Sequence, residues 1–96
     1  MKNIEWKEFV DVAYFGADAF MRYHNKIYQY GGYYETCYCI YVYTWTDKEV
    51  CDDVTKVLEI KSNTNEGIWK QFLSAAIFDG KTLEEAGDEF EFLYWG

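Results

Sequence analysis

The spacing of hydrophobic and polar positions changes along this chain, and each change of period marks a predicted element. Near the start, Trp6, Phe9, Val10 and Ala13 recur at helical spacing. They form one apolar stripe, while the charged residues between them lie off it. This pattern predicts an amphipathic helix over residues 4–15.

The segment that follows has the pattern of a β-sheet. Strands are expected over residues 17–23 and 27–30, on either side of His24-Asn25-Lys26. Asparagine tolerates the positive φ that tight hairpin turns require, so a hairpin is expected here. Gly31-Gly32 is expected to break the second strand. A long third strand is predicted over 34–45, because its Tyr, Ile, Val and Thr residues suit a pleated surface.

Residues 46–61 fit two patterns. Val50, Val54, Val57 and Leu58 match a helical stripe, but residues 54–60 are also β-branched and of strand length. We favour a polar loop or helical turn over 46–53 and then a strand over 54–60. Periodicity alone does not decide between the two, so a helix stays an alternative.

The clearest helical pattern covers Asn65 to Phe78, with Asn63 and Thr64 as candidate N-caps. Its wide apolar face is typical of a helix packed on a core. Thr82 and Glu85 then have the spacing of a capping box, which predicts a new helix start. A short helix over 83–87 and a strand over 89–95 are expected. One longer helix over 83–94 is the alternative.

These elements predict the fold class α+β. We expect a small antiparallel sheet of about four or five strands, packed with an N-terminal helix and a helix in the C-terminal half. The chain has 96 residues and shows no repeat, linker or shift of composition. It is therefore interpreted as a single acidic domain over residues 1–96.

Composition supports a folded, water-soluble protein. Half of the residues are hydrophobic and 22% are aromatic, which is unlike the composition of disordered chains. No apolar run reaches the roughly 20 residues of a membrane helix, and the N-terminus lacks a signal-peptide pattern. The three cysteines suit reduced thiols better than a secreted disulfide framework. The expected location is the cytoplasm of a host cell.

The net charge of −8 is unevenly distributed. Residues 1–48 carry six acids and five bases, whereas residues 49–96 carry eleven acids and four bases. Direct binding to nucleic acid needs a basic surface, and adsorption to anionic membranes needs one as well. Both classes are therefore disfavoured, and a basic protein partner is favoured. The alternative is that the acidity only keeps the protein soluble.

The densest acidic segment lies near the C-terminus. Six acids fall between residues 79 and 91, opposed only by Lys81, and aromatic residues interleave with them. Carboxylates on a rigid scaffold can present charge to a basic groove as a phosphate backbone does, and aromatic neighbours would supply contact area. A solvated acidic surface without a partner is the alternative. The predicted partner-binding residues are Glu84, Glu85, Asp88, Glu89 and Glu91, with Tyr94 and Trp95 as anchors.

Candidate chemistry is sparse. His24, Cys37, Cys39 and Cys51 form the only set that resembles metal ligands, but an extended strand would splay Cys37 and Cys39 apart. Buried packing of these thiols is favoured. No nucleophile, metalloprotease or phosphate-loop motif accompanies the single histidine. We expect no catalytic residue, no metal and no cofactor, and an enzyme is the least favoured class.

The sheet segment is crowded with tyrosines. A domain of this size cannot bury all of them, so some are expected at the surface, where tyrosine favours interfaces. This supports partner binding, or self-association through a tyrosine-rich face as the alternative function. The oligomeric state stays open. The tyrosines are Tyr28, Tyr30, Tyr33, Tyr34, Tyr38, Tyr41 and Tyr43.

The order of helix, antiparallel sheet, helix and short acidic element resembles the small anti-CRISPR proteins of phages. The nearest stretch is Asn65-Glu66-Gly67-Ile68-Trp69-Lys70-Gln71-Phe72-Leu73, a helix after a strand, followed by the acidic segment. The resemblance covers most of the chain as architecture and assigns no functional residue. It implies a phage or mobile-element inhibitor that occupies the basic nucleic-acid-binding site of a host defence protein, such as a CRISPR effector nuclease.

Overall fold

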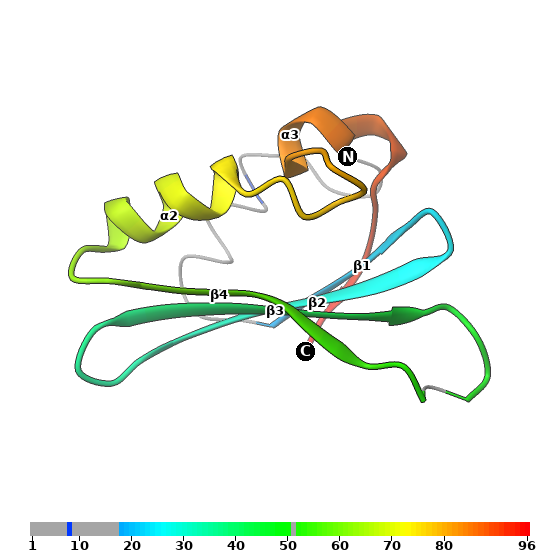
Figure 1. Ribbon diagram of the computed structural model, residues 1–96, viewed down its shortest axis with the longest axis horizontal. Coiled ribbons are helices and arrows are strands. Elements are labelled where there is room, and N and C mark those ends of the chain that lie inside the picture. The colour runs from blue at the N-terminus through cyan, green and yellow to red at the C-terminus, as the bar shows by residue number, and fades with distance from the viewer. Residues whose placement is uncertain (1–7, 9–17, 51) are drawn as a thin grey trace.

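A computed structural model describes residue 8 and residues 18–50 and 52–96, and it contains one five-stranded antiparallel sheet with helices over one face (Figure 1). The order of strands across the sheet is β4-β3-β2-β1-β5. This confirms the α+β class. The helix expected over residues 4–15 lies outside the described residues, except for Glu8. The elements are β1 (Ala19–Tyr23), β2 (Lys26–Tyr34), β3 (Tyr38–Thr46), β4 (Thr55–Ser62), α2 (Asn65–Ser74), α3 (Leu83–Ala86), the 3-10 helix η1 (Gly87–Glu89) and β5 (Glu91–Trp95).

The predicted hairpin between β1 and β2 is confirmed. Its two turn residues, His24 and Asn25, have φ values of 48° and 64°. Positive φ at both central positions is the signature of a type I′ turn, whose twist matches that of the flanking strands. The closing pair is Tyr23 opposite Lys26.

The expected break at Gly31-Gly32 is wrong. β2 continues through both glycines, which pair with Tyr41 and Ile40 of β3. The chain turns instead over residues 35–37, so β3 begins at Tyr38 rather than at residue 34. At Gly31 the Tyr41 ring of the neighbouring strand lies close to the backbone, so this glycine pair does not mark a turn.

The strand interpretation of residues 54–60 is confirmed, and the helical alternative for 46–61 is wrong. β4 pairs with β3 along its length, with one irregularity between Val42 and Tyr43. The loop before it is held by Asp53, whose carboxylate accepts hydrogen bonds from the Thr46 backbone N–H at 3.1 and 3.2 Å. The Thr46 hydroxyl donates to the same carboxylate at 2.5 Å.

Helix α2 begins where the sequence predicts and ends earlier. The Thr64 hydroxyl accepts a hydrogen bond from the Gly67 N–H at 3.0 Å, which caps the N-terminus. The helix stops at Ser74, and the predicted extension to Phe78 is wrong. Phe78 instead exchanges two backbone hydrogen bonds of 3.0 Å with Lys81.

The capping box at Thr82 and Glu85 is confirmed, with hydrogen bonds of 2.9 and 3.2 Å. α3 is only four residues long, because the chain tightens into η1 at Gly87 and then extends into β5. The alternative of one helix over 83–94 is therefore wrong. None of the helices in the described ranges is long and apolar enough to cross a membrane.

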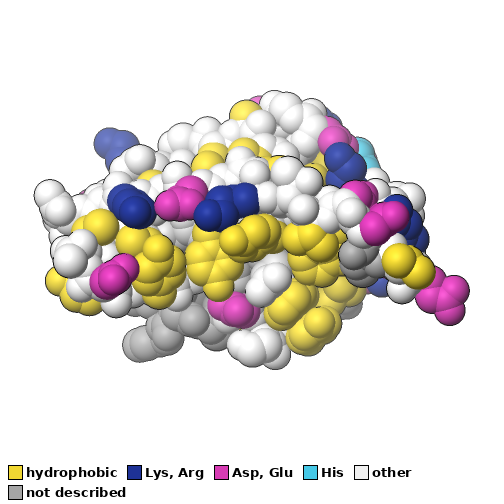
Figure 2. Space-filling model, turned by 60° about the horizontal axis from the view of Figure 1, so that its bottom comes forward, with side chains coloured by type: hydrophobic (Ala, Val, Ile, Leu, Met, Phe, Trp, Pro, Cys, Tyr) yellow, Lys and Arg dark blue, Asp and Glu magenta, His cyan; other side chains and the backbone are white. Residues whose placement is uncertain are grey.

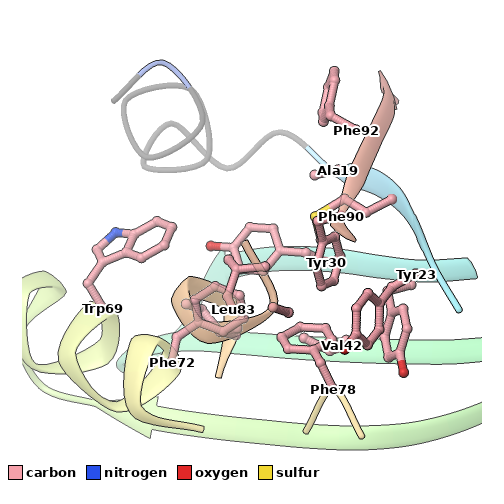
Figure 3. Packing of buried hydrophobic residues seen from close by; sticks show 14 of the residues in the cluster. Ala19, Tyr23, Tyr30, Val42, Trp69, Phe72, Phe78, Leu83, Phe90 and Phe92 are labelled. Carbon is pink, nitrogen blue, oxygen red and sulfur yellow. The ribbon is translucent and has the colours of Figure 1, made fainter. Parts of the chain in front are cut away.

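The core lies between the helices and one face of the sheet (Figure 3). Phe72 of α2, Leu83 of α3 and Phe90 after η1 are fully buried there. The strands contribute the side chains that point to the same side, among them Tyr30 and Val42. The opposite face of the sheet carries no described helix or strand (Figure 1).

Candidate functional site

The predicted partner-binding carboxylates fall into two places. Four of them lie on α3 and η1 with exposed side chains, and the exposed Asp79 lies on the adjacent turn. Glu84 and Glu85 lie in the single turn of α3, and Asp88 and Glu89 follow in η1. We call this group the acidic surface, and its members are Asp79, Glu84, Glu85, Asp88 and Glu89.

His24 ties the acidic surface to the β1–β2 turn. Its Nδ1 lies 3.0 Å from a carboxylate oxygen of Asp79, and its Nε2 lies 3.3 Å from one of Glu89. The Lys81 ammonium reaches Glu89 at 3.8 Å. The Tyr23 ring stacks on the imidazole with a centroid separation of 3.9 Å. One imidazole thus joins the β1–β2 turn to Asp79 and to Glu89, which both lie more than fifty residues away in the sequence.

This geometry stabilises the charged forms on both sides. The pKa of His24 is raised, first by its hydrogen bond to Asp79 and then by that to Glu89. The hydrogen bond from His24 also lowers the pKa of Glu89. The pKa of Glu85 is lowered because it accepts the Thr82 backbone N–H of the capping box. These two carboxylates therefore stay ionised at neutral pH.

We expect the pairing of His24 to make folding stability depend on pH. The folded pKa of His24 lies above its ordinary value of 6.5, so its contribution is complete below that value. The contribution is lost as the pH rises through the folded pKa. Urea unfolding from about pH 6 to about pH 8 should show stability falling in the wild type and a flatter profile in His24→Asn. Asparagine tolerates the positive φ of this turn. An imidazole that titrates at or below 6.5 by NMR would contradict the prediction.

The other three predicted residues lie on β5 and face different ways. Glu91 binds Arg22 at 2.5 Å, and Arg22 also binds Asp47 at 2.8 Å. Tyr94 is 55% exposed and stacks on Phe20, whereas Trp95 packs against the core. The structure therefore does not join Tyr94 and Trp95 to the acidic surface as a pair of anchors.

A second surface is formed by the side of the sheet that points away from the helices. Tyr33, Tyr41 and Tyr43 lie there because they alternate with the buried positions of β2 and β3. The tyrosine-rich segment thus divides between two faces, since Tyr28 and Tyr30 are buried in the core. Figure 2 shows a band of hydrophobic side chains bordered by basic and acidic ones. We call this the outer aromatic face, and its rings are Phe20, Tyr33, Tyr41, Tyr43, Trp45 and Tyr94.

The two described cysteines are closer than expected. Their Sγ atoms are 3.9 Å apart, so the prediction that a strand splays them is wrong. Cys37 precedes β3 and belongs to the turn, which brings its sulfur back toward the buried Cys39. Burial raises the pKa of the Cys37 thiol. His24 lies at the other end of the sheet, and no group of three metal-ligating side chains occurs within residues 18–50 and 52–96.

An open groove of about 330 Å³ lies at the ends of β2, β3 and β4. Its two charged groups are Lys26 and Asp53. The Asp53 carboxylate already accepts hydrogen bonds from the backbone N–H and the hydroxyl of Thr46, and its pKa is lowered mainly by the Thr46 hydroxyl. Asp53 therefore organises the loop, and its lone pairs are largely used.

Sequence reasoning found the acidic surface because its carboxylates are close in the chain. It missed the role of His24, which depends on contacts with residues more than fifty positions away. It also missed the division of the tyrosines, although the alternation along β2 and β3 carried that signal. No known family, curated protein or solved structure matches this chain, so any function must be argued from these surfaces.

Proposed function

We propose that this chain is a small acidic binding protein that occupies a basic, nucleic-acid-binding site on another protein. The observation that carries the proposal is the acidic surface, where five exposed carboxylates lie within residues 79–89 and Lys81 is the only lysine or arginine. Such a surface attracts a basic groove and steers its approach. The resemblance to phage anti-CRISPR proteins points to a CRISPR effector nuclease in the host cytoplasm as the partner.

The rigid support of these carboxylates favours a binding role. Glu85 is fixed by the capping box, and Asp79 and Glu89 are fixed by His24, so three of the five carboxylates are held in place before a partner arrives. Charges that are already ordered lose less side-chain entropy on binding. Glu91 is paired with Arg22 on another part of the surface and is left out of the proposed contact.

The test is competition binding to purified CRISPR effector nucleases loaded with guide RNA. The chain should displace labelled target DNA, and its affinity should fall steeply with added salt because attraction between exposed charges is screened. The double variant Glu84→Lys and Asp88→Lys should bind at least about tenfold more weakly. These positions avoid the capping box and the His24 contacts.

The control is Glu35→Lys, a single charge reversal of the same kind on the turn between β2 and β3, away from the acidic surface. It should bind like the wild type. A pull-down from host lysate extends the search to other basic proteins. The proposal fails if no basic partner competes with nucleic acid, or if affinity is flat from low to high salt.

A further inference from the structure

The rings of the outer aromatic face form a continuous surface rather than isolated exposed groups. The centroids of Tyr33 and Tyr41 are 6.2 Å apart, and those of Tyr41 and Tyr43 are 5.5 Å apart. The Lys56 ammonium lies 5.7 Å from the Tyr43 ring centre. Continuous apolar patches of this kind are unusual on monomeric proteins and mark interaction sites.

One glycine is fitted to this surface. A Cβ atom on Gly31 would collide with Cζ and the hydroxyl of Tyr41, its partner across the ladder. The absence of a side chain at Gly31 lets the Tyr41 ring lie flat across β2. Gly31 therefore keeps the Tyr41 ring on the outer aromatic face, in contact with Tyr33 and Tyr43.

The charges on this face largely neutralise one another. Lys56 binds Glu59 at 2.6 Å, and Lys61 approaches the same carboxylate at 3.9 Å. At the other side of the sheet, Arg22 binds Glu91. Arg22 also binds Asp47, and the Asp18 carboxylate lies 3.5 Å from Gln29 on the same face. The described face and its rim thus carry three bases and four acids, while the whole chain has a net charge of −8. The surplus negative charge lies elsewhere on the molecule.

This charge distribution indicates which kind of partner binds the outer aromatic face. Two copies with a net charge of −8 repel each other, but they can meet with least repulsion where the charges nearly balance. A basic partner gains little at a face whose acids are mostly paired with bases. Nucleic acid gains little from three bases that are already paired with acids. A second copy of the same chain therefore fits this face best.

The available area is adequate for a weak or moderate dimer. Five strands about 4.8 Å apart and about seven residues long at about 3.3 Å each span roughly 24 by 23 Å. Because side chains protrude from the sheet, the accessible area is larger than this projected area and approaches the roughly 800 Å² per partner of a standard interface. We propose that the outer aromatic face is the interface of a symmetric homodimer, in which the same patch of each copy packs on its equivalent.

The experiment is sedimentation equilibrium of the full chain over a wide concentration range. The wild type should associate to a dimer, and added salt should strengthen the dimer because it screens the repulsion of two acidic chains. Tyr33→Glu should weaken dimerisation at least about a hundredfold, since the symmetric interface would meet the new charge twice. The control is Tyr34→Glu, the next residue along β2, which points to the other face and should dimerise as the wild type does.

Tyr33 and Tyr34 are 47% and 66% exposed, so both variants are expected to fold, and circular dichroism verifies this. A wild type that stays monomeric at millimolar concentration overturns the proposal. Equal weakening by both variants also overturns it.

A fluorescent oligothymidine adds a second arm: binding by a monomeric wild type and loss of that binding in Tyr33→Glu would assign the face to single-stranded nucleic acid. Added salt is expected to strengthen the dimer but to weaken the contact at the acidic surface. The two proposals therefore predict opposite responses to salt, and either can fail alone.

Discussion

Replacing Phe90 with alanine is expected to lower the free energy of unfolding by about 3–5 kcal/mol. Phe90 is fully buried and stacks on Tyr23 at a centroid separation of 5.0 Å. Its ring is perpendicular to that of Phe78, with a centroid separation of 4.8 Å. Truncation removes these contacts and leaves a cavity, because the rings come from different segments that do not collapse together easily.

Such a loss is a large part of the roughly 5–15 kcal/mol that stabilises a typical domain. Urea unfolding followed by circular dichroism measures it. Tyr34→Ala serves as the control, since Tyr34 is 66% exposed and its truncation should cost less than about 1 kcal/mol. Equal losses in the two variants would show that Phe90 is not a central contact of the core.

The second large effect is expected at Gly31. Gly31→Val should lower the free energy of unfolding by about 1–3 kcal/mol, although valine favours strands, because its side chain would occupy the space of the Tyr41 ring. The ring must then leave the surface of the sheet, and it loses its contacts with Tyr33 and Tyr43.

A double-mutant cycle isolates this contact. In a Tyr41→Ala background the space is empty, so Gly31→Val should cost little or even stabilise the strand. Unfolding free energies of the four proteins give the coupling energy. If valine is equally harmful with and without the tyrosine, the backbone at Gly31 is the cause and the cross-strand contact is not.

Local chemistry accounts for the elements that the sequence predicts well. The type I′ turn at His24 and Asn25 and the capping box at Thr82 depend on neighbouring residues only. The same holds for the Thr64 cap of α2. Each is a short-range preference that the fold leaves in place, so pattern reasoning finds it.

Tertiary contacts account for the errors. Gly31 looks like a strand breaker until the Tyr41 ring on the neighbouring strand is known. The apolar pattern of α2 continues to Phe78, but that residue pairs with Lys81 in a separate turn. The acidic surface could be predicted because its members all lie within residues 79–89. The pairing of Glu91 with Arg22 depends on β5 lying next to β1, which periodicity cannot show.

The position of β5 also has a consequence during synthesis on the ribosome. β5 is translated after the other described strands, yet it covers the edge of β1, which is translated before them. Until residues 91–95 leave the exit tunnel, the backbone groups along that edge of β1 lack their β5 partner and Phe92 is missing from the core. The nascent chain therefore exposes an open strand edge, which can pair with other chains, and sheet formation is completed only after translation reaches β5.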